Sequence, residues 1–290
     1  MSREHVLLLG GTGFIGSALA VRLRQERQTV HVVGRNDVQR LEHLLPNCST
    51  VIHLASATTP GASSAQPELE QANLEMTHHL VQCLQKQADT NLIYFSSGGT
   101  VYGNPLQLPV HEDSAIAPIS PYGAAKIAQE NICKNLRTHG NAVTILRPSN
   151  AYGPSQTPKS GFGLVRTLLE HAQMGTTMEI WGDGENMRDY LYIDDIVEST
   201  LRLMRLPQHS GTYNLGSGLG HSVNQVKNLV EQVTGLPVKT IFRPARGIDV
   251  RAVVLNTTRL CTQLDWQPRV GLAQGLASTW QKSLCGMKPW

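Results

Sequence analysis

The feature that most constrains this chain is a glycine-rich turn between an apolar run and an amphipathic segment. Residues 6–9 read VLLL, residues 10–16 read GGTGFIG, and Ala18, Leu19 and Leu23 follow on one face of a predicted helix. Glycines at this spacing let backbone N–H groups approach a pyrophosphate, and the helix N-terminus adds a partial positive charge. The alternative is an ordinary glycine turn. We therefore expect a strand–turn–helix unit of a parallel α/β fold with a dinucleotide site.

The rest of the first half alternates apolar runs with helical segments, which is typical of βαβ units. Only 16 or so residues separate Gly34 from Val51, enough for one helix but hardly for a further strand. We expect a Rossmann-type doubly wound parallel sheet whose third strand is abbreviated or absent. Its predicted strands are 6–9, 29–33, 51–54, 92–95 and 143–146, and its predicted helices are 15–25, 38–45, 69–87 and 122–139.

The second half contains more turns and predicts a smaller α/β substrate lobe. Helices are expected at 163–173, 223–234 and 272–283, and the Thr-, Ser-, Gly- and Pro-rich stretch 58–65 is expected to be a flexible loop. The domain prediction is 1–148 for the dinucleotide-binding domain, with a returning segment near 190–215, and 149–290 mainly for the substrate lobe. Ligands of such sheets bind at the carboxyl ends of the strands.

The end of the second predicted strand bears on the cofactor. An acidic residue there would hydrogen-bond a ribose 2′-hydroxyl and favour NAD, but the chain has Gly34 followed by Arg35. A guanidinium group matches the geometry of a phosphate, so the sequence favours NADP slightly over NAD. The alternative is a surface Arg35 that stacks on adenine and serves either cofactor.

A second motif places Tyr122 and Lys126 four residues apart, on one face of a helix that begins after Pro121. A free phenol has a pKa of about 10, and a nearby ammonium lowers it by stabilising the phenolate. Tyr122 could then exchange a proton with a hydroxyl group while hydride moves to or from a cofactor. The alternative is a core tyrosine beside a solvated lysine.

Composition excludes several other classes of protein. The net charge of +3 comes from cations scattered along the 290 residues, so no nucleic-acid-binding stripe is expected. Five cysteines without a CxxC pair indicate neither a disulfide framework nor a zinc site, and no metal is expected. No apolar stretch is long enough to span a membrane. A cytoplasmic protein with reduced thiols is the expectation.

The motifs together resemble the extended short-chain dehydrogenase/reductase family, specifically its nucleotide-sugar epimerase/dehydratase group, over essentially the whole chain. Besides the two motifs above, the resemblance includes HLAS at 53–56, SSGGTVYG at 96–103 and RPSNAYGP at 147–154. It continues through WGDG at 181–184, RDY at 188–190, YNLGSG at 213–218 and LDWQP at 264–268.

The resemblance implies a role for each matching residue. Tyr122 would be the catalytic base, and Lys126 would lower its pKa and bind the nicotinamide ribose. Further cofactor contacts are implied for Gly10, Gly13, Phe14, Ile15, Gly16, Arg35, Leu54, Ala55, Asn73, Ser96 and Pro148. Contacts with a nucleotide-sugar substrate are implied for Ser97, Thr100, Asn150, Arg188, Arg246 and Asp249. For Arg188 the alternative is a structural salt bridge with Asp189 or Asp194. A homodimer formed through the helices at 69–87 and 122–139 is also implied.

Two departures from the family pattern separate the candidate functions. Gly98 stands where a catalytic Ser or Thr is common, so Thr100, or else Ser97, must supply the hydroxyl group that polarises the sugar oxygen. The Asp-Glu pair of 4,6-dehydratases is absent from this stretch, which disfavours water elimination. We expect an NAD(P)-dependent 4-epimerase acting through a 4-keto intermediate. The alternatives are an NADPH-dependent reductase of a 4-keto nucleotide sugar and a catalytically impaired binding protein.

Overall fold

A computed structural model describes residues 5–157, 163–206, 209–247 and 249–285. The chain forms two compact units. The first comprises Met1–Ser97, Ser120–Arg147 and Val197–Tyr213, and the second comprises Gly98–Ile119, Pro148–Ile196 and Asn214–Trp290.

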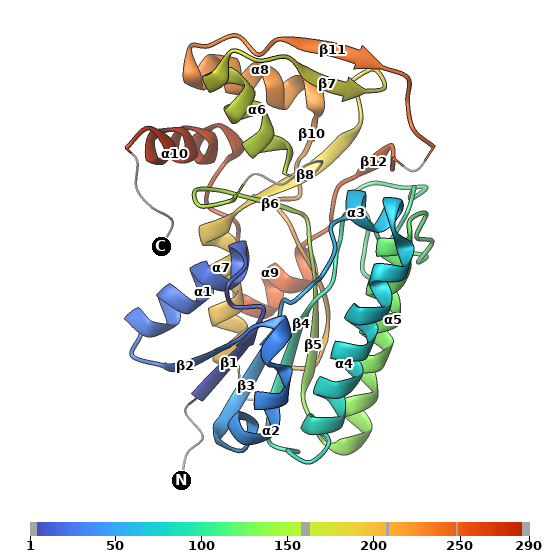
Figure 1. Ribbon diagram of the computed structural model, residues 1–290, viewed down its shortest axis with the longest axis vertical. Coiled ribbons are helices and arrows are strands. Elements are labelled where there is room, and N and C mark those ends of the chain that lie inside the picture. The colour runs from blue at the N-terminus through green and yellow to red at the C-terminus, as the bar shows by residue number, and fades with distance from the viewer. Residues whose placement is uncertain (1–4, 158–162, 207–208, 248, 286–290) are drawn as a thin grey trace. The chain divides into compact units, whose positions relative to one another are not determined.

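A six-stranded sheet is the frame of the first unit, and its order is β2-β1-β3-β4-β5-β9 (Figure 1). Strands β1 to β5 pair in parallel along that order. The parallel sheet with flanking helices confirms the predicted Rossmann-type fold. The strands are β1 (His5–Leu9), β2 (Thr29–Val33), β3 (Cys48–His53), β4 (Asn91–Phe95), β5 (Val143–Pro148) and β9 (Gly211–Leu215).

The segment between β2 and β3 contains short helices, and in the described part of the chain β2 ends the strand order. This confirms that the third strand is missing. The single helix expected at 38–45 is instead three short pieces, namely the 3₁₀ helix η1 (Arg35–Arg40), α2 (Leu41–Leu44) and the 3₁₀ helix η2 (Leu45–Asn47). Asp37 has non-helical dihedral angles within η1, and Pro46 lies in the first turn of η2.

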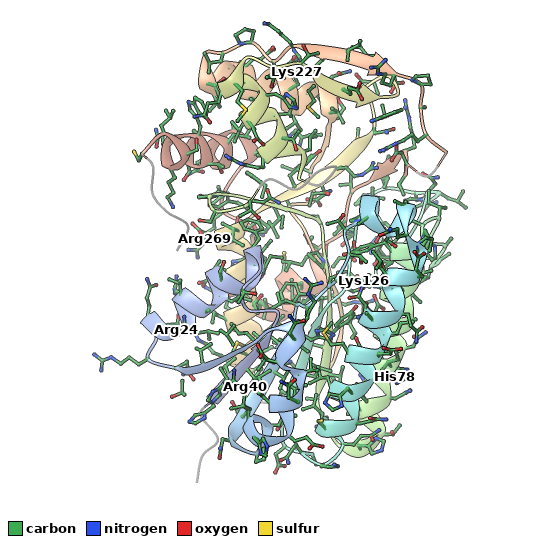
Figure 2. All side chains as sticks on the ribbon, in the orientation of Figure 1. Arg24, Arg40, His78, Lys126, Lys227 and Arg269 are labelled. Atoms are coloured by element: carbon green, nitrogen blue, oxygen red, sulfur yellow. The ribbon has the colours of Figure 1, made fainter. Side chains whose placement is uncertain are left out.

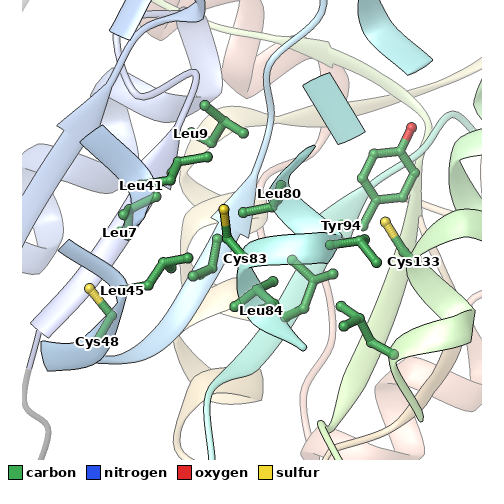
Figure 3. Close-up of a cluster of buried hydrophobic side chains, with 14 of the residues drawn as sticks. Leu7, Leu9, Leu41, Leu45, Cys48, Leu80, Cys83, Leu84, Tyr94 and Cys133 are labelled. Atoms are coloured by element: carbon green, nitrogen blue, oxygen red, sulfur yellow. The ribbon is translucent and has the colours of Figure 1, made fainter. Parts of the chain in front are cut away.

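Helices α4 (Glu70–Leu84) and α5 (Pro121–Lys134) pack against each other on one face of the sheet, and α1 (Phe14–Gln25) and α7 (Ile193–Met204) flank the other (Figure 1). Figure 3 shows the apolar core beneath α4, where Leu80 and Leu84 lie among side chains of β1 and α2. The leucines of β1 are fully buried. Burial on both faces explains why β1 reads as a continuous apolar run rather than an alternating one.

The expected flexible loop at 58–65 is wrong, because most of it forms helix α3 (Pro60–Ala65). Thr59 caps this helix by accepting a hydrogen bond from the Ala62 N–H group at 3.3 Å. Pro60 occupies the first helical position, where its fixed φ suits a helix and its missing N–H costs nothing. The same threonine and proline that indicated a loop therefore begin a helix.

The second unit holds the remaining elements. Strand β8 (Met187–Tyr192) pairs with β10 (Gly220–Ser222), β12 (Ala252–Val253) and β6 (Asn150–Tyr152), while β7 (Met178–Trp181) pairs with β11 (Thr240–Arg243). Its helices are α6 (Leu164–Met174), α8 (Val223–Thr234), α9 (Thr258–Leu264) and α10 (Leu272–Leu284). Three of these helices confirm the expected segments. Within the described ranges, no helix has the length and apolarity needed to cross a bilayer.

Candidate active site

The glycine turn after β1 is tightly enclosed by backbone. Gly10 adopts a φ of 90°, and a Cβ atom at this position would lie 2.6 Å from the Ala55 amide nitrogen. A Cβ atom on Gly16 would lie 2.5 Å from the Gly10 carbonyl oxygen. At Gly10 the left-handed φ and the close approach both exclude a side chain, and at Gly16 the close approach alone does so. These two glycines shape the turn and bring α1 against β1 and β3.

The glycine turn leaves the N-terminus of α1 accessible at Gly13. Gly13 is its exposed N-cap and has no side chain to accept a hydrogen bond from the first turn. The N–H groups of Phe14, Ile15 and Gly16 belong to that first turn, where no intrahelical acceptor exists. A Cβ atom on Gly13 would meet only the Gly10 carbonyl oxygen, at 3.4 Å. The turn thus has the donors and the space that a cofactor pyrophosphate requires.

Substituting the glycines separates folding from cofactor binding. Gly13→Ala is expected to weaken NAD(P) binding at least about tenfold, which is 1.4 kcal/mol, because the new methyl group occupies the open face of the turn. Its cost in stability should stay below about 1 kcal/mol, as for other poor N-caps. Gly16→Ala should instead destabilise the fold by about 1–3 kcal/mol, because its Cβ atom would overlap backbone. Isothermal titration and thermal unfolding measure the two effects. Unchanged cofactor affinity in Gly13→Ala would remove this turn from the site.

Helix α5 carries Tyr122 and Lys126 in its first two turns. Ser120 fixes the start of the helix, since its Oγ atom accepts a hydrogen bond from the Gly123 N–H group at 3.2 Å. Lys126 is labelled in Figure 2. Its side chain is buried, and its Nζ atom donates to the Phe95 carbonyl oxygen at 3.2 Å. The same Nζ atom lies 5.6 Å from the centre of the Tyr122 ring and 5.2 Å from that of Tyr94. Lys126 is therefore a core ammonium beside the phenol and not a solvated surface residue.

Burial dominates the electrostatics of this pair. It raises the pKa of Tyr122 above its ordinary value, and the negative charge of Glu70 raises that pKa further. Burial also lowers the pKa of Lys126 to about 8, against the opposing attraction of Glu70, Cys133 and Glu130. The phenol of the free protein is thus protonated at neutral pH, and additional positive charge is needed to make it a base. A depression of the Tyr122 pKa by Lys126 stays a prediction.

Asn73 fixes the segment that follows β3. Its Oδ1 atom accepts a hydrogen bond from the Ala57 N–H group at 2.7 Å, and its Nδ2 atom donates to Glu70 Oε2 at 2.7 Å and to Thr58 Oγ1 at 3.1 Å. Asn73 is 1% exposed. Leu54, at the start of this segment, donates its N–H group to the Leu9 carbonyl oxygen at 2.8 Å. The amide of Asn73 therefore holds in place the backbone that was expected to contact the cofactor.

The hydroxyl groups after β4 have different surroundings. Ser96 is buried and donates to Glu130 Oε1 at 2.7 Å. Glu130 in turn accepts two hydrogen bonds from the guanidinium group of Arg147, at 2.7 and 2.8 Å. Ser97 is partly exposed. In the second unit, the buried Oγ1 atom of Thr100 has no hydrogen-bond partner among the described residues. The hydroxyl group of Ser96 is thus committed to the core, whereas a substrate contact of Thr100 or Ser97 stays a prediction.

A pocket of about 360 Å³ lies in the second unit. Arg246 contacts it and forms a two-point ion pair with Asp249, with nitrogen–oxygen distances of 2.9 and 3.0 Å. The Arg246 guanidinium group also lies 5.1 Å from the centre of the Trp181 ring. The residues lining the pocket are Gly182, Asp183, Asn186, Ala245, Arg246, Asp249 and Arg251. The two arginines of this lining suit the phosphates of a nucleotide diphosphate.

The structure brings together only some of the predicted substrate residues. Arg246 and Asp249 share the pocket, while Asn150 and Arg188 lie on the paired strands β6 and β8. The Nδ2 atom of Asn150 donates to the Asp189 carbonyl oxygen at 3.0 Å, and Arg188 donates to that of Met187 at 2.8 Å. Sequence reasoning did not assign roles to Arg251, Asp183 or Trp181. The WGDG motif that contains two of them was the available signal.

Asp189 has a structural role that answers one alternative for Arg188. Its carboxylate accepts hydrogen bonds from the N–H and hydroxyl groups of Ser217, both at 2.8 Å, and from the N–H groups of Gly218 at 3.0 Å and Leu255 at 3.3 Å. These bonds fix the turn after β9. The Asp189 carboxylate is thus committed to Ser217, Gly218 and Leu255 rather than to a salt bridge with Arg188.

Comparison with known proteins places the chain in a family. The sequence profile of the NAD dependent epimerase/dehydratase family matches residues 6–216. The chain belongs to this family. A UDP-glucose 4-epimerase of Mycolicibacterium smegmatis is 31% identical over 95% of the chain and 97% of that protein. A dTDP-4-dehydro-6-deoxyglucose reductase of Escherichia coli is 26% identical over 94% and 96%.

Solved structures of epimerases have the same fold. The crystal structure of a Thermotoga maritima UDP-glucose 4-epimerase with UDP-glucose has a TM-score of 0.91 and 30% identity, covering 97% of this chain and 99% of that one. A Thermus thermophilus UDP-glucose 4-epimerase in complex with NAD has a TM-score of 0.91 and 26% identity, covering 98% and 100%. Both belong to the group of nucleotide-sugar enzymes that the sequence motifs indicated.

Proposed function

We propose that the chain is an NAD(P)-dependent 4-epimerase of a nucleotide-activated hexose. The observation that carries this proposal is the pairing of Tyr122 with a buried Lys126 at the start of α5, in a chain whose β1–α1 turn has room for a pyrophosphate. The near full-length similarity to UDP-glucose 4-epimerases supports it.

Each residue has a defined task in this proposal. Tyr122 would accept the proton of the C4 hydroxyl group and later return it, and Thr100 would donate a hydrogen bond to the same sugar oxygen. Lys126 would hold the nicotinamide ribose and favour the phenolate. Bound NAD(P) would supply the acceptor that takes hydride from C4 and gives it back to the opposite face. Turnover then needs no net oxidant or reductant.

The pocket of the second unit would hold the nucleotide diphosphate. Arg246 already presents its guanidinium group there, but Asp249 neutralises it. A pyrophosphate would compete with the Asp249 carboxylate for the same two N–H donors, because both match the guanidinium fork. Asp249 is then free to accept hydrogen bonds from a ribose.

A homodimer formed through α4 and α5 stays a prediction.

The preference for NADP rests on Arg35. This residue is exposed at the start of η1, directly after β2, which ends the described strand order. Arg35→Ala is expected to raise the Kd for NADP about 10- to 100-fold and to leave that for NAD nearly unchanged, because only NADP offers a 2′-phosphate. Fluorescence titration of the protein with each cofactor measures both constants. Arg24→Ala on exposed α1 is the control, and equal losses for NAD and NADP would rule out the phosphate contact.

The second candidate is an NADPH-dependent reductase of a 4-keto nucleotide sugar. Arg35 and the missing third strand favour it, because a shortened adenosine site suits a cofactor that exchanges at every turnover. The similarity to the Escherichia coli reductase is compatible with it.

One experiment separates these functions. The purified protein is passed through gel filtration and assayed with UDP-glucose in the absence of added cofactor. An epimerase should retain its cofactor and form UDP-galactose. In a parallel assay, NADPH and a 4-keto nucleotide sugar are added, and consumption of NADPH in proportion to that sugar, without interconversion of UDP-hexoses, would favour the reductase. Tight binding of cofactor and UDP-sugar with neither activity would indicate a binding protein.

A further inference from the structure

Glu70 is a buried carboxylate that neither sequence motif includes. It is the first residue of α4 and is 6% exposed. Its Oε1 atom accepts a hydrogen bond from Thr58 Oγ1 at 2.6 Å, and its Oε2 atom accepts one from Asn73 Nδ2 at 2.7 Å. Both donors are neutral. A buried carboxylate is costly to keep ionised, so its position requires a nearby positive charge or a functional reason.

Hydrogen bonds between α4 and α5 show which charge lies near Glu70. Gln129 on α5 donates its side-chain amide to the Asn73 carbonyl oxygen at 3.3 Å and to Thr77 Oγ1 at 2.7 Å. Glu70 precedes Asn73 by three residues on α4, and Lys126 precedes Gln129 by three residues on α5. Since both helices cross back over parallel strands, they run in the same direction, and three residues is about one helical turn. Glu70 and Lys126 therefore each lie about one turn N-terminal to the contact between Asn73 and Gln129.

The other titratable groups near Lys126 do not supply a free negative charge. Burial lowers the pKa of His53 to about 3, so this imidazole is neutral. Burial raises the pKa values of Tyr94, Tyr122 and Cys133, so these groups are protonated at neutral pH. Glu130 is already neutralised by Arg147 at 2.7 Å and Lys134 at 3.1 Å. Helix α3, which packs on α5, carries no titratable side chain.

We propose that Glu70 is a positioning residue of the active site, a buried countercharge that holds the Lys126 ammonium beside Tyr122 without touching substrate or cofactor. This role deepens the proposed function and rests on it for its catalytic meaning. The hydrogen bonds from Thr58 and Asn73 fix the carboxylate, and the same Asn73 fixes the backbone at Ala57. The same hydrogen-bond network thus fixes both the Glu70 carboxylate and the segment after β3.

The sign of the effect follows from the charge of Glu70. Burial lowers the pKa of Lys126 to about 8, and Glu70 opposes this by attracting the ammonium. Glu70 also raises the pKa of Tyr122, because it repels the phenolate. Removing the charge while keeping the shape should therefore lower both pKa values. Activity should need protonated Lys126 and ionised Tyr122. The pH range over which Glu70→Gln is active should therefore lie at lower pH than that of the wild-type protein.

The test is a titration of Lys126 that requires no turnover. Protein labelled with ¹³C at lysine Cε is titrated by NMR, and the Lys126 signal is assigned with Lys126→Arg. In Glu70→Gln the midpoint should fall by about one pH unit. Glu70→Asp, which keeps the charge, should stay near the wild-type midpoint. Glu75→Gln, on the exposed face of the same helix, is the matched control. An unchanged midpoint in Glu70→Gln would overturn the proposal.

A second measurement covers the case in which Glu70→Gln does not fold. In wild-type protein labelled with ¹³C at glutamate Cδ, the Glu70 signal should shift with the same midpoint as the Lys126 signal, and the absence of that shift would contradict the proposal. Where the 4-epimerase activity is present, kcat/KM of Glu70→Gln should have both pH limbs displaced to lower pH. A purely structural residue would lower stability and leave the limbs in place. Both titrations remain valid even if the protein is not an epimerase.

Discussion

Replacing Tyr122 with phenylalanine is expected to lower kcat for UDP-hexose interconversion by about 10²- to 10⁴-fold. The substitution removes the only atom that the proposed mechanism uses to take the proton from the C4 hydroxyl group. It leaves the ring beside Lys126, so cofactor and UDP-sugar affinities should change little. Steady-state kinetics with wild-type and variant protein measure the loss, and isothermal titration checks binding.

The control is Tyr192→Phe, which removes the phenol of a buried tyrosine in the second unit. Its hydroxyl group contacts Ser278 Oγ at 3.0 Å. The loss should cost about 1 kcal/mol of stability and leave kcat close to wild type. If Tyr122→Phe kept wild-type kcat, proton transfer would have to pass through another group, and the assignment of Tyr122 would be wrong.

Replacing Arg147 with methionine is expected to lower the free energy of unfolding by about 3–5 kcal/mol. The Glu130 side chain is fully buried, and the substitution would leave its carboxylate without the two short hydrogen bonds that compensate burial. Urea unfolding followed by circular dichroism measures the change. Arg22→Met is the matched control, because Arg22 pairs with Glu26 at 3.2 Å with half of its side chain exposed. It should cost no more than about 1 kcal/mol. Equal effects of the two substitutions would contradict the assigned role of the buried pair.

The same pair predicts how acid affects stability. Burial alone would raise the pKa of Glu130, but hydrogen bonds and charge from Arg147, with Ser96 and Lys134, hold it below the ordinary value of 4.5. A depressed carboxyl pKa stabilises the folded state above the ordinary value, and this contribution disappears as the pH falls through the folded-state pKa. The wild-type protein should therefore lose stability below about pH 4.5, and Arg147→Met should lose less over that range.

Much of the fold was predictable because its signals are local. The leucine run of β1 and the glycines at 10, 13 and 16 identify one strand, one turn and one helix without reference to the rest of the chain. The 16 or so residues between Gly34 and Val51 are hardly enough for a helix and a strand, so the missing third strand was also predictable. Helix α3 was not predicted, because Thr59 and Pro60 favour a turn and a helix start equally.

The candidate site was less predictable because burial decides its chemistry. The YxxxK spacing placed Tyr122 and Lys126 on one helical face, but only the structure shows that Lys126 is buried on the Phe95 carbonyl oxygen. Glu70 was not found, since a glutamate near a helix N-terminus is ordinarily a solvated capping residue. The Arg246 pocket likewise joins residues more than 60 positions apart.

The central claim is that hydrogen leaves C4 and returns to C4 within one enzyme molecule, while Tyr122 accepts and returns the proton of the C4 hydroxyl group. The most direct measurement uses UDP-glucose deuterated at C4, incubated with the purified protein in ordinary water without added cofactor. NMR or mass spectrometry then locates the label in the UDP-galactose formed. The account predicts that the deuterium remains at C4. Loss of the label from C4 to water would contradict it.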